Sequence, residues 1–218
     1  MTNKQLIKEL LEEQKYGQLV KIAGKKHSQT LKYIQMNLFG DINESLRWSA
    51  LEAIGRLTRE YAPKETEVYK NLIRRFLWAM NDESGNVPWS SPEGIGIIIA
   101  NQPFLFGEYT PMLITNAMDN PMCHRGMLWA AGKIGSIRPS LVVPFMGYIL
   151  PFLEEEDIEL RAYAAWALGE ISCKDALPRL KNLDNLEGKV NIYREGKLSE
   201  VSIASLINES IGKIELAS

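Results

Sequence analysis

Apolar and small side chains recur at helical spacing along the chain, and five stretches of this pattern are centred on a glycine. Each glycine has an apolar residue one place before it and another two places after it. The five are Gly55, Gly96, Gly132, Gly169 and Gly212, separated by 41, 36, 37 and 43 residues. A period near 40 residues is typical of stacked helix pairs. The repeated glycine predicts a close approach between helices, because it has no side chain.

The same periodicity predicts where the helices lie. The repeat-defining second helices are expected near residues 44–58, 90–100, 122–136, 158–172 and 201–215. Other helices are expected near 66–80, 108–118, 140–154 and 174–183. The chain is therefore predicted to be an all-α superhelix of about five helix pairs, in which residues 1–218 form one domain.

The helical period changes once, near the C-terminus. Alternating segments at 189–193 and 198–202 flank the sequence Arg-Glu-Gly-Lys, which predicts a short β-hairpin over residues 189–202. Because this element occurs once, it lies outside the repeat.

One stripe of the second helices carries the candidate binding residues. It joins the positions seven before, three before and one after each glycine, which share a helix face. Second helices usually line the concave side of such a stack, so we expect this inner stripe to contact a partner. The candidates are Trp48, Glu52, Trp89, Glu93, Arg125, Trp129, Lys133, Trp166 and Glu170.

The tryptophans divide into two predicted roles. Trp129 and Trp166 stand in a column that holds glutamate in the other three repeats, so we expect both to face the surface as binding anchors. Packing between repeats is the alternative for them. Trp78 lies on a first helix and is expected in the core. Glu93 follows Pro92 near a predicted helix start, where the helix dipole also favours a carboxylate.

Two segments resemble a known repeat. Leu160–Ile171 (LRAYAAWALGEI) and Leu46–Leu57 (LRWSALEAIGRL) are similar to the HEAT-like repeat of the phycobilin-lyase type. The resemblance implies a helical solenoid that acts as an interaction scaffold. Some relatives assist chromophore attachment, and a distant helical relative with HEAT-like repeats excises alkylated bases from DNA.

Charge and composition narrow the function. The net charge is −2 and the pI is near 5.8, so a nucleic-acid partner is not expected. Two cysteines and a polar start with no targeting core favour the cytoplasm, and no segment is long enough to span a membrane. Neighbouring Cys123 and His124 point apart on a helix, so no metal site, cofactor or catalytic residue is expected.

Two classes of function fit the inner stripe. The first is a non-enzymatic scaffold or adaptor that binds a protein or peptide along the concave face. The alternative is an enzyme of the HEAT-like glycosylase type, or an assembly factor of the chromophore-lyase type. A glycosylase needs a basic surface for DNA. The stripe instead balances Arg56, Arg125, Lys133 and Lys213 against Glu52, Glu93, Glu170 and Glu209. The pattern sets no oligomeric state.

Overall fold

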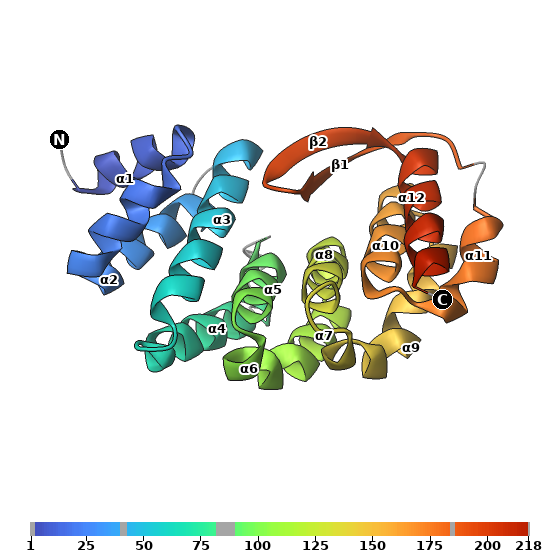
Figure 1. Ribbon diagram of the computed structural model, residues 1–218, viewed down its shortest axis with the longest axis horizontal. Coiled ribbons are helices and arrows are strands. Elements are labelled where there is room, and N and C mark those ends of the chain that lie inside the picture. Colours follow the sequence, from blue (N-terminus) through green and yellow to red (C-terminus); the bar gives the residue numbers. More distant parts are fainter. Residues whose placement is uncertain (1–2, 40–42, 82–89, 184–185, 218) are drawn as a thin grey trace.

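The chain is a curved stack of helices, as the computed structural model describes it for residues 3–39, 43–81, 90–183 and 186–217 (Figure 1). An inner row of helices lines the concave side. Its members are α3 (Glu44–Tyr61), α5 (Ser91–Asn101), α8 (His124–Gly135), α10 (Ile158–Ile171) and α12 (Ile203–Leu216). These are the second helices that the glycine spacing predicts, so the all-α superhelix is confirmed.

Other helices form the outer, convex row. They are α4 (Thr66–Met80), α6 (Pro103–Phe106), α7 (Thr110–Met118), α9 (Met146–Ile149) and α11 (Leu177–Lys181), and α1 (Asn3–Glu12) and α2 (Tyr16–Phe39) precede the first full pair. Short 3₁₀ segments connect the outer helices to each other and to the inner row: η1 (Gly107–Tyr109), η2 (Pro121–Cys123), η3 (Pro139–Leu141), η4 (Val143–Phe145), η5 (Leu150–Glu154) and η6 (Lys174–Ala176).

The prediction of one continuous helix over residues 140–154 is wrong. The segment is divided into η4, α9 and η5, after η3 at its start. Pro144 and Pro151 cause the division, because proline lacks the N–H that an α-helix needs and its ring clashes with the preceding turn.

The repeated glycines stand where neighbouring inner helices touch. A Cβ added to each would lie 2.8 Å from the nearest side-chain atom at Gly55, 2.4 Å at Gly96, 2.6 Å at Gly132 and 2.6 Å at Gly169. In each case the atom belongs to the next inner helix. At Gly212 nothing lies within 4 Å. Gly212 is on α12, which has no later inner helix to pack against, so the column is a packing feature of the stack.

Side-chain caps set where several inner helices begin. Asn43 accepts a hydrogen bond from the backbone of Leu46 at the start of α3, and Asp157 accepts two at the start of α10. Ser202, the last residue of the hairpin, caps α12. These bonds satisfy backbone N–H donors that the first helical turn leaves free. They therefore fix the residue at which each of these inner helices begins.

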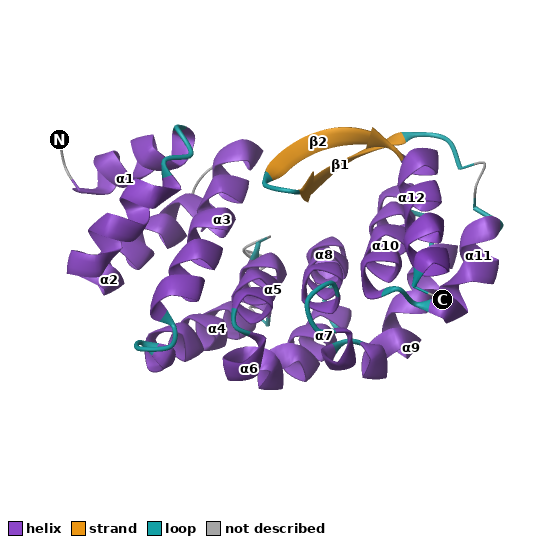
Figure 2. Cartoon of the chain, in the orientation of Figure 1, coloured by secondary structure: helices purple, strands orange, loops and turns teal. Residues whose placement is uncertain are grey.

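The predicted hairpin is confirmed. Strands β1 (Lys189–Arg194) and β2 (Lys197–Ser202) pair antiparallel around a two-residue turn. Glu195 and Gly196 have φ of 54° and 78°, the left-handed values of a tight hairpin turn. Figure 2 shows the hairpin arching across the open side of the stack, from α12 to α3. It therefore covers part of the concave face.

Trp78 is not in the core, contrary to expectation. Its side chain is 74% exposed on α4, whereas Phe76 and Met80 of the same helix are buried. A residue two places from both buried neighbours lies about 200° around the helix from them, on the solvent side. In the described ranges, no helix combines the length and apolarity needed to cross a bilayer.

Candidate binding surface

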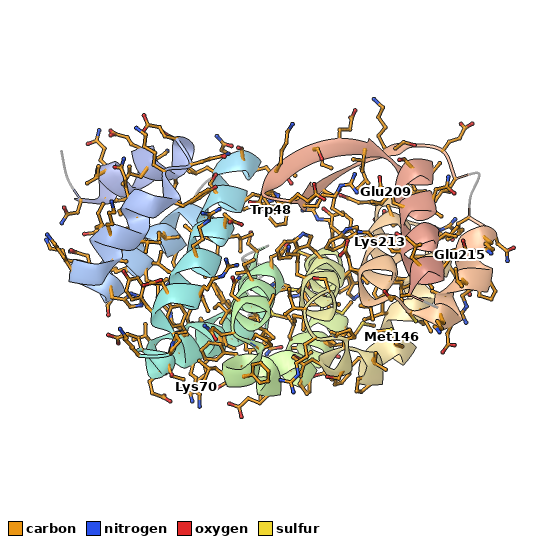
Figure 3. The ribbon with its side chains drawn as sticks, in the orientation of Figure 1. Trp48, Lys70, Met146, Glu209, Lys213 and Glu215 are labelled. Carbon is orange, nitrogen blue, oxygen red and sulfur yellow. The ribbon has the colours of Figure 1, made fainter. Side chains whose placement is uncertain are left out.

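Side chains of the inner helices hold the hairpin by contacts to both its side chains and its main chain. The Tyr193 ring stacks on Trp48, with centroids 4.6 Å apart and planes 3° from parallel. The Trp129 indole Nε1 donates a hydrogen bond of 2.8 Å to the Tyr193 carbonyl oxygen. The Tyr163 hydroxyl donates one of 2.7 Å to the Asn191 carbonyl oxygen. Figure 3 shows Trp48 on the part of α3 that lies by the hairpin.

The hairpin register explains why these two carbonyls are available. Arg194 pairs with Lys197 beside the turn, and the hydrogen-bonded pairs alternate along the ladder from there. Asn191 and Tyr193 therefore direct their backbone groups to the outer edge of β1, away from β2. The backbone groups of an unpaired strand edge need hydrogen-bond partners or a covering element. Side chains of the inner helices supply these partners here.

Three tryptophans of the stripe are buried, so the expectation that Trp129 and Trp166 face solvent is wrong. The exposed fraction is 4% for Trp48, 0% for Trp129 and 3% for Trp166. The hairpin covers Trp48 and Trp129, and the Trp166 ring packs into the space that Gly132 leaves open. Trp89 lies outside the described residues.

The charged residues of the stripe form hydrogen bonds and a cation–π contact at its margins. Glu52 accepts a hydrogen bond of 2.8 Å from Arg56 and another of 3.4 Å from the Tyr193 hydroxyl. Lys133 lies over the Trp129 ring, 5.9 Å from its centroid. On the last two inner helices, Glu170 accepts a hydrogen bond from Lys213, and Figure 3 marks Lys213 on α12.

A shallow groove of about 130 Å³ continues the stripe towards the C-terminal ends of α3, α5 and α8. We call it the inner groove. Its lining includes Glu52, Arg56, Arg59, Asn101, Lys133 and Ile137, and no hairpin residue. The Asn101 amide oxygen accepts hydrogen bonds from Arg59, and Ile137 is 60% exposed. Three cations against one carboxylate give the groove a basic character.

A second hollow of about 180 Å³, the Glu93 pocket, lies at the N-terminal ends of α5, α8 and α10. Its lining includes Glu93, Met122, Arg125, Gly126, Glu159 and Leu160. The sequence places Glu93 and Arg125 on the inner stripe. Glu93 is instead 5% exposed, and Arg125 donates a hydrogen bond of 3.0 Å to Glu159. Burial raises the pKa of Glu93 to about 7, and Arg125 is among the charges that oppose this rise.

The neighbouring Cys123 and His124 do not form a reactive pair. Burial raises the pKa of the Cys123 thiol to about 11, so the thiol stays protonated near neutral pH. The His124 ring instead forms a T-shaped contact with Phe152, with centroids 5.0 Å apart. Among the residues that the structure describes, no three His, Cys, Asp or Glu side chains gather as metal ligands.

Comparison with known proteins agrees with this architecture. The model of the PBS lyase HEAT-like repeat matches residues 160–185, which include most of α10 and all of α11. Among solved structures, the chain is similar to a designed armadillo repeat protein at 16% identity and a TM-score of 0.52. That alignment covers 98% of this chain and 95% of the other. The chain therefore has the fold of a helical repeat protein, and residues 160–185 match a HEAT-like repeat. No curated protein sequence matches the chain.

The sequence pattern did not identify Tyr193 and Tyr163 as part of the surface. Tyr193 lies in β1, which is not repeated, and Tyr163 lies six residues before the glycine of its repeat, outside the three columns of the stripe. The one available signal was the hairpin itself, an amphipathic element with an aromatic residue beside its turn. Periodicity gives no information on where such an element docks.

Proposed function

We propose that this helical repeat protein is a non-enzymatic scaffold that binds a partner protein along its concave face. The way in which the face holds β1 supports the proposal most directly. Trp129 and Tyr163 donate hydrogen bonds to main-chain carbonyls of an extended strand. Bonds to the main chain do not depend on the strand's sequence. A face that holds one extended segment in this way is suited to hold another.

The inner groove is the part of this surface that the hairpin leaves free. Arg56 and Arg59 are exposed there, next to the apolar side chain of Ile137. Exposed arginines beside apolar groups are typical of protein interfaces. Because cations outnumber carboxylates in the groove, the proposed partner segment carries acidic side chains, which charge complementarity favours.

Charge reversal in the groove tests the proposal. The double variant Arg59→Glu, Lys133→Glu changes the sign of the groove. Lys32→Glu, on the exposed side of α2, is the matched control. We expect capture of partner proteins from a native lysate to fall at least tenfold for the double variant and to remain unchanged for the control. Circular dichroism of each variant checks that the fold is retained. Full capture by a folded double variant contradicts the proposal.

A further inference from the structure

Each arginine of the inner groove is held on one side and free on the other. Arg56 Nε donates a hydrogen bond of 2.8 Å to Glu52, and the guanidinium lies over the Tyr16 ring, 4.7 Å from its centroid. Arg59 donates from Nε and Nη2 to the Asn101 amide oxygen, at 3.2 and 2.9 Å. Both Nη atoms of Arg56 and the Nη1 of Arg59 have no hydrogen-bond partner among the described residues. These N–H groups are therefore available to a ligand.

The orientation of Arg59 depends on the close approach of α3 and α5. Asn101 Nδ2 donates a hydrogen bond of 2.8 Å to the Ile97 carbonyl oxygen, so both ends of this amide are engaged. A Cβ on Gly55 would lie 2.8 Å from the same Nδ2 atom. Gly55 thus leaves the space in which Asn101 reaches Arg59. The guanidinium is fixed before a ligand arrives, which lowers the entropy lost on binding.

Lys133 brings a third cation to the inner groove from α8. The Trp48 and Trp129 rings, on α3 and α8, have centroids 5.0 Å apart, so side chains of these two helices meet across the concave face. Lys133 lies one helical turn beyond Trp129. Its Nζ lies over the Trp129 ring and forms no ion pair among the described residues. Lys133 lines the same hollow as Arg56 and Arg59, so the three cations surround one space.

The charge of the inner groove matches a dianion. Its three cations, Arg56, Arg59 and Lys133, and its one carboxylate, Glu52, leave a net charge of +2. A phosphate monoester carries a charge of about −1.5 to −2 at neutral pH and has three acceptor oxygens. A carboxylate has one charge and two oxygens. The planar fork of an arginine also fits phosphate oxygens well.

The shape of the inner groove favours a ligand that belongs to a longer chain. Pockets for small molecules enclose most of their ligand. The inner groove is shallow instead, and the apolar side chain of Ile137 at its margin is 60% exposed. A peptide segment can cover Ile137 while one of its side chains enters the groove.

We propose that the inner groove binds a phosphorylated side chain of a partner protein, with Arg56, Arg59 and Lys133 donating to the phosphate oxygens. This inference rests on the proposed scaffold function, because it states which acidic group the partner segment carries. Asn101 is a positioning residue, since it acts through Arg59. The apolar contact to Ile137 comes from the residues that flank the phosphate.

Calorimetry on the full chain tests the proposal with three alanine-based peptides that differ only in a central phosphoserine, glutamate or serine. Coulomb attraction grows with the charge of the ligand, so we expect the phosphoserine peptide to bind about tenfold more tightly than the glutamate peptide. The serine peptide should not bind. Equal affinity for the phosphoserine and glutamate peptides, or no binding of the phosphoserine peptide, overturns the proposal.

Inorganic phosphate distinguishes a partner side chain from a small ligand. The flanking peptide adds contacts such as the one to Ile137, so we expect inorganic phosphate to bind more weakly than the phosphoserine peptide. If inorganic phosphate binds at least as tightly, the groove holds a small phosphate, and the assignment to a partner protein is overturned.

Variants assign the binding to the inner groove. Arg59→Gln and Lys133→Gln each remove one charge and should lower the affinity for the phosphoserine peptide about tenfold. Asn101→Ala keeps every charge but removes the bonds that orient Arg59, and it should lower the affinity about threefold. Lys32→Gln, an exposed cation on α2 outside the groove, is the control and should leave the affinity unchanged. Full affinity in folded Arg59→Gln and Lys133→Gln overturns the assignment.

Phosphatase treatment of the native lysate separates this inference from the proposed function. Dephosphorylation should lower capture of the partner by the unchanged protein about tenfold, the same factor as the peptide preference. If capture resists phosphatase but is lost in Arg59→Glu, Lys133→Glu, the scaffold function stands and the phosphate assignment is overturned. If capture resists both treatments, both proposals are overturned.

Discussion

Trp129 and Trp166 provide a matched pair for measuring how strongly the hairpin is held. Both stand three residues before their glycine, on adjacent inner helices, and both are buried. They differ in the hydrogen bonding of one atom, the indole Nε1. The Trp129 Nε1 donates to the Tyr193 carbonyl oxygen at 2.8 Å, whereas the Trp166 Nε1 has no partner among the described residues. Replacement of each by phenylalanine removes the N–H and a similar volume.

The hydrogen bond sets the expected difference between the two variants. Trp129→Phe leaves the Tyr193 carbonyl without its partner, and an unsatisfied buried group costs about 1–3 kcal/mol. Trp166→Phe removes a donor that is already unsatisfied, so only the loss of packing remains. We therefore expect Trp129→Phe to lower the free energy of unfolding by about 2 kcal/mol more than Trp166→Phe. A water molecule that enters the vacated space would recover part of this difference.

Urea unfolding, followed by the helical circular dichroism signal, measures the two free energies. Hydrogen exchange of the β1 amides gives an independent measure, because the hairpin should open more readily only in Trp129→Phe. Equal destabilisation of the two variants, with unchanged β1 protection in both, would refute the claim that the indole hydrogen bond anchors the hairpin.

Three further outcomes follow from the packing and the charges. Gly96→Ala should cost about 1–3 kcal/mol, because its Cβ would meet Ala130 at 2.4 Å, while Gly212→Ala has open space and should stabilise α12 by about 0.5–1 kcal/mol; thermal melts compare them. The pKa of Glu93 is raised on folding from 4.5 to about 7, so its contribution is complete below pH 4.5 and is lost as the pH rises through 7, by about 3 kcal/mol in total; urea midpoints from pH 4 to 8 should show this loss in the unchanged protein and not in Glu93→Gln. Trp78→Ser should change the unfolding free energy by at most about 0.5 kcal/mol, since the ring is 74% exposed; a larger loss in urea unfolding would place it in the core after all.

The sequence was sufficient to predict the architecture, because the same helical unit repeats along the chain. The glycines marked the contacts between inner helices, and the inner helices and the hairpin lie where the pattern predicted them. Individual side chains were predicted less well. Trp78 was assigned to the core by residue type, although its position between Phe76 and Met80 placed it on the opposite face of α4. The helix at 140–154 was expected from its apolar residues, against the prolines within it.

The error over Trp129 and Trp166 has a different physical cause. Glutamate in the same column of other repeats indicated an open surface, and that inference assumes that every repeat has the same surroundings. The hairpin breaks this equivalence at Trp129, because it runs over the inner row once, whereas Trp166 is buried by packing against Gly132 of the neighbouring helix. Three residues of the column form hydrogen bonds with the hairpin. Glu52 accepts one from the Tyr193 hydroxyl, Trp129 donates one to the hairpin main chain, and Glu209 accepts one from Arg194.

Departures from the repeat consensus therefore carry the information that the period omits. Three of the five residues in this column contact the hairpin, and Glu93, which does not, lies buried against Gly126 instead. At the three positions that contact the hairpin, the residue type suits the contact: Glu52 and Glu209 accept hydrogen bonds from a hydroxyl and a guanidinium, and the Trp129 indole donates one to a carbonyl oxygen. In a solenoid, a column that alternates between tryptophan and glutamate thus indicates an element docked across the repeats as readily as it indicates an exposed binding site. The two are related here, since the surface that accepts the hairpin is the one on which the proposed partner site is built.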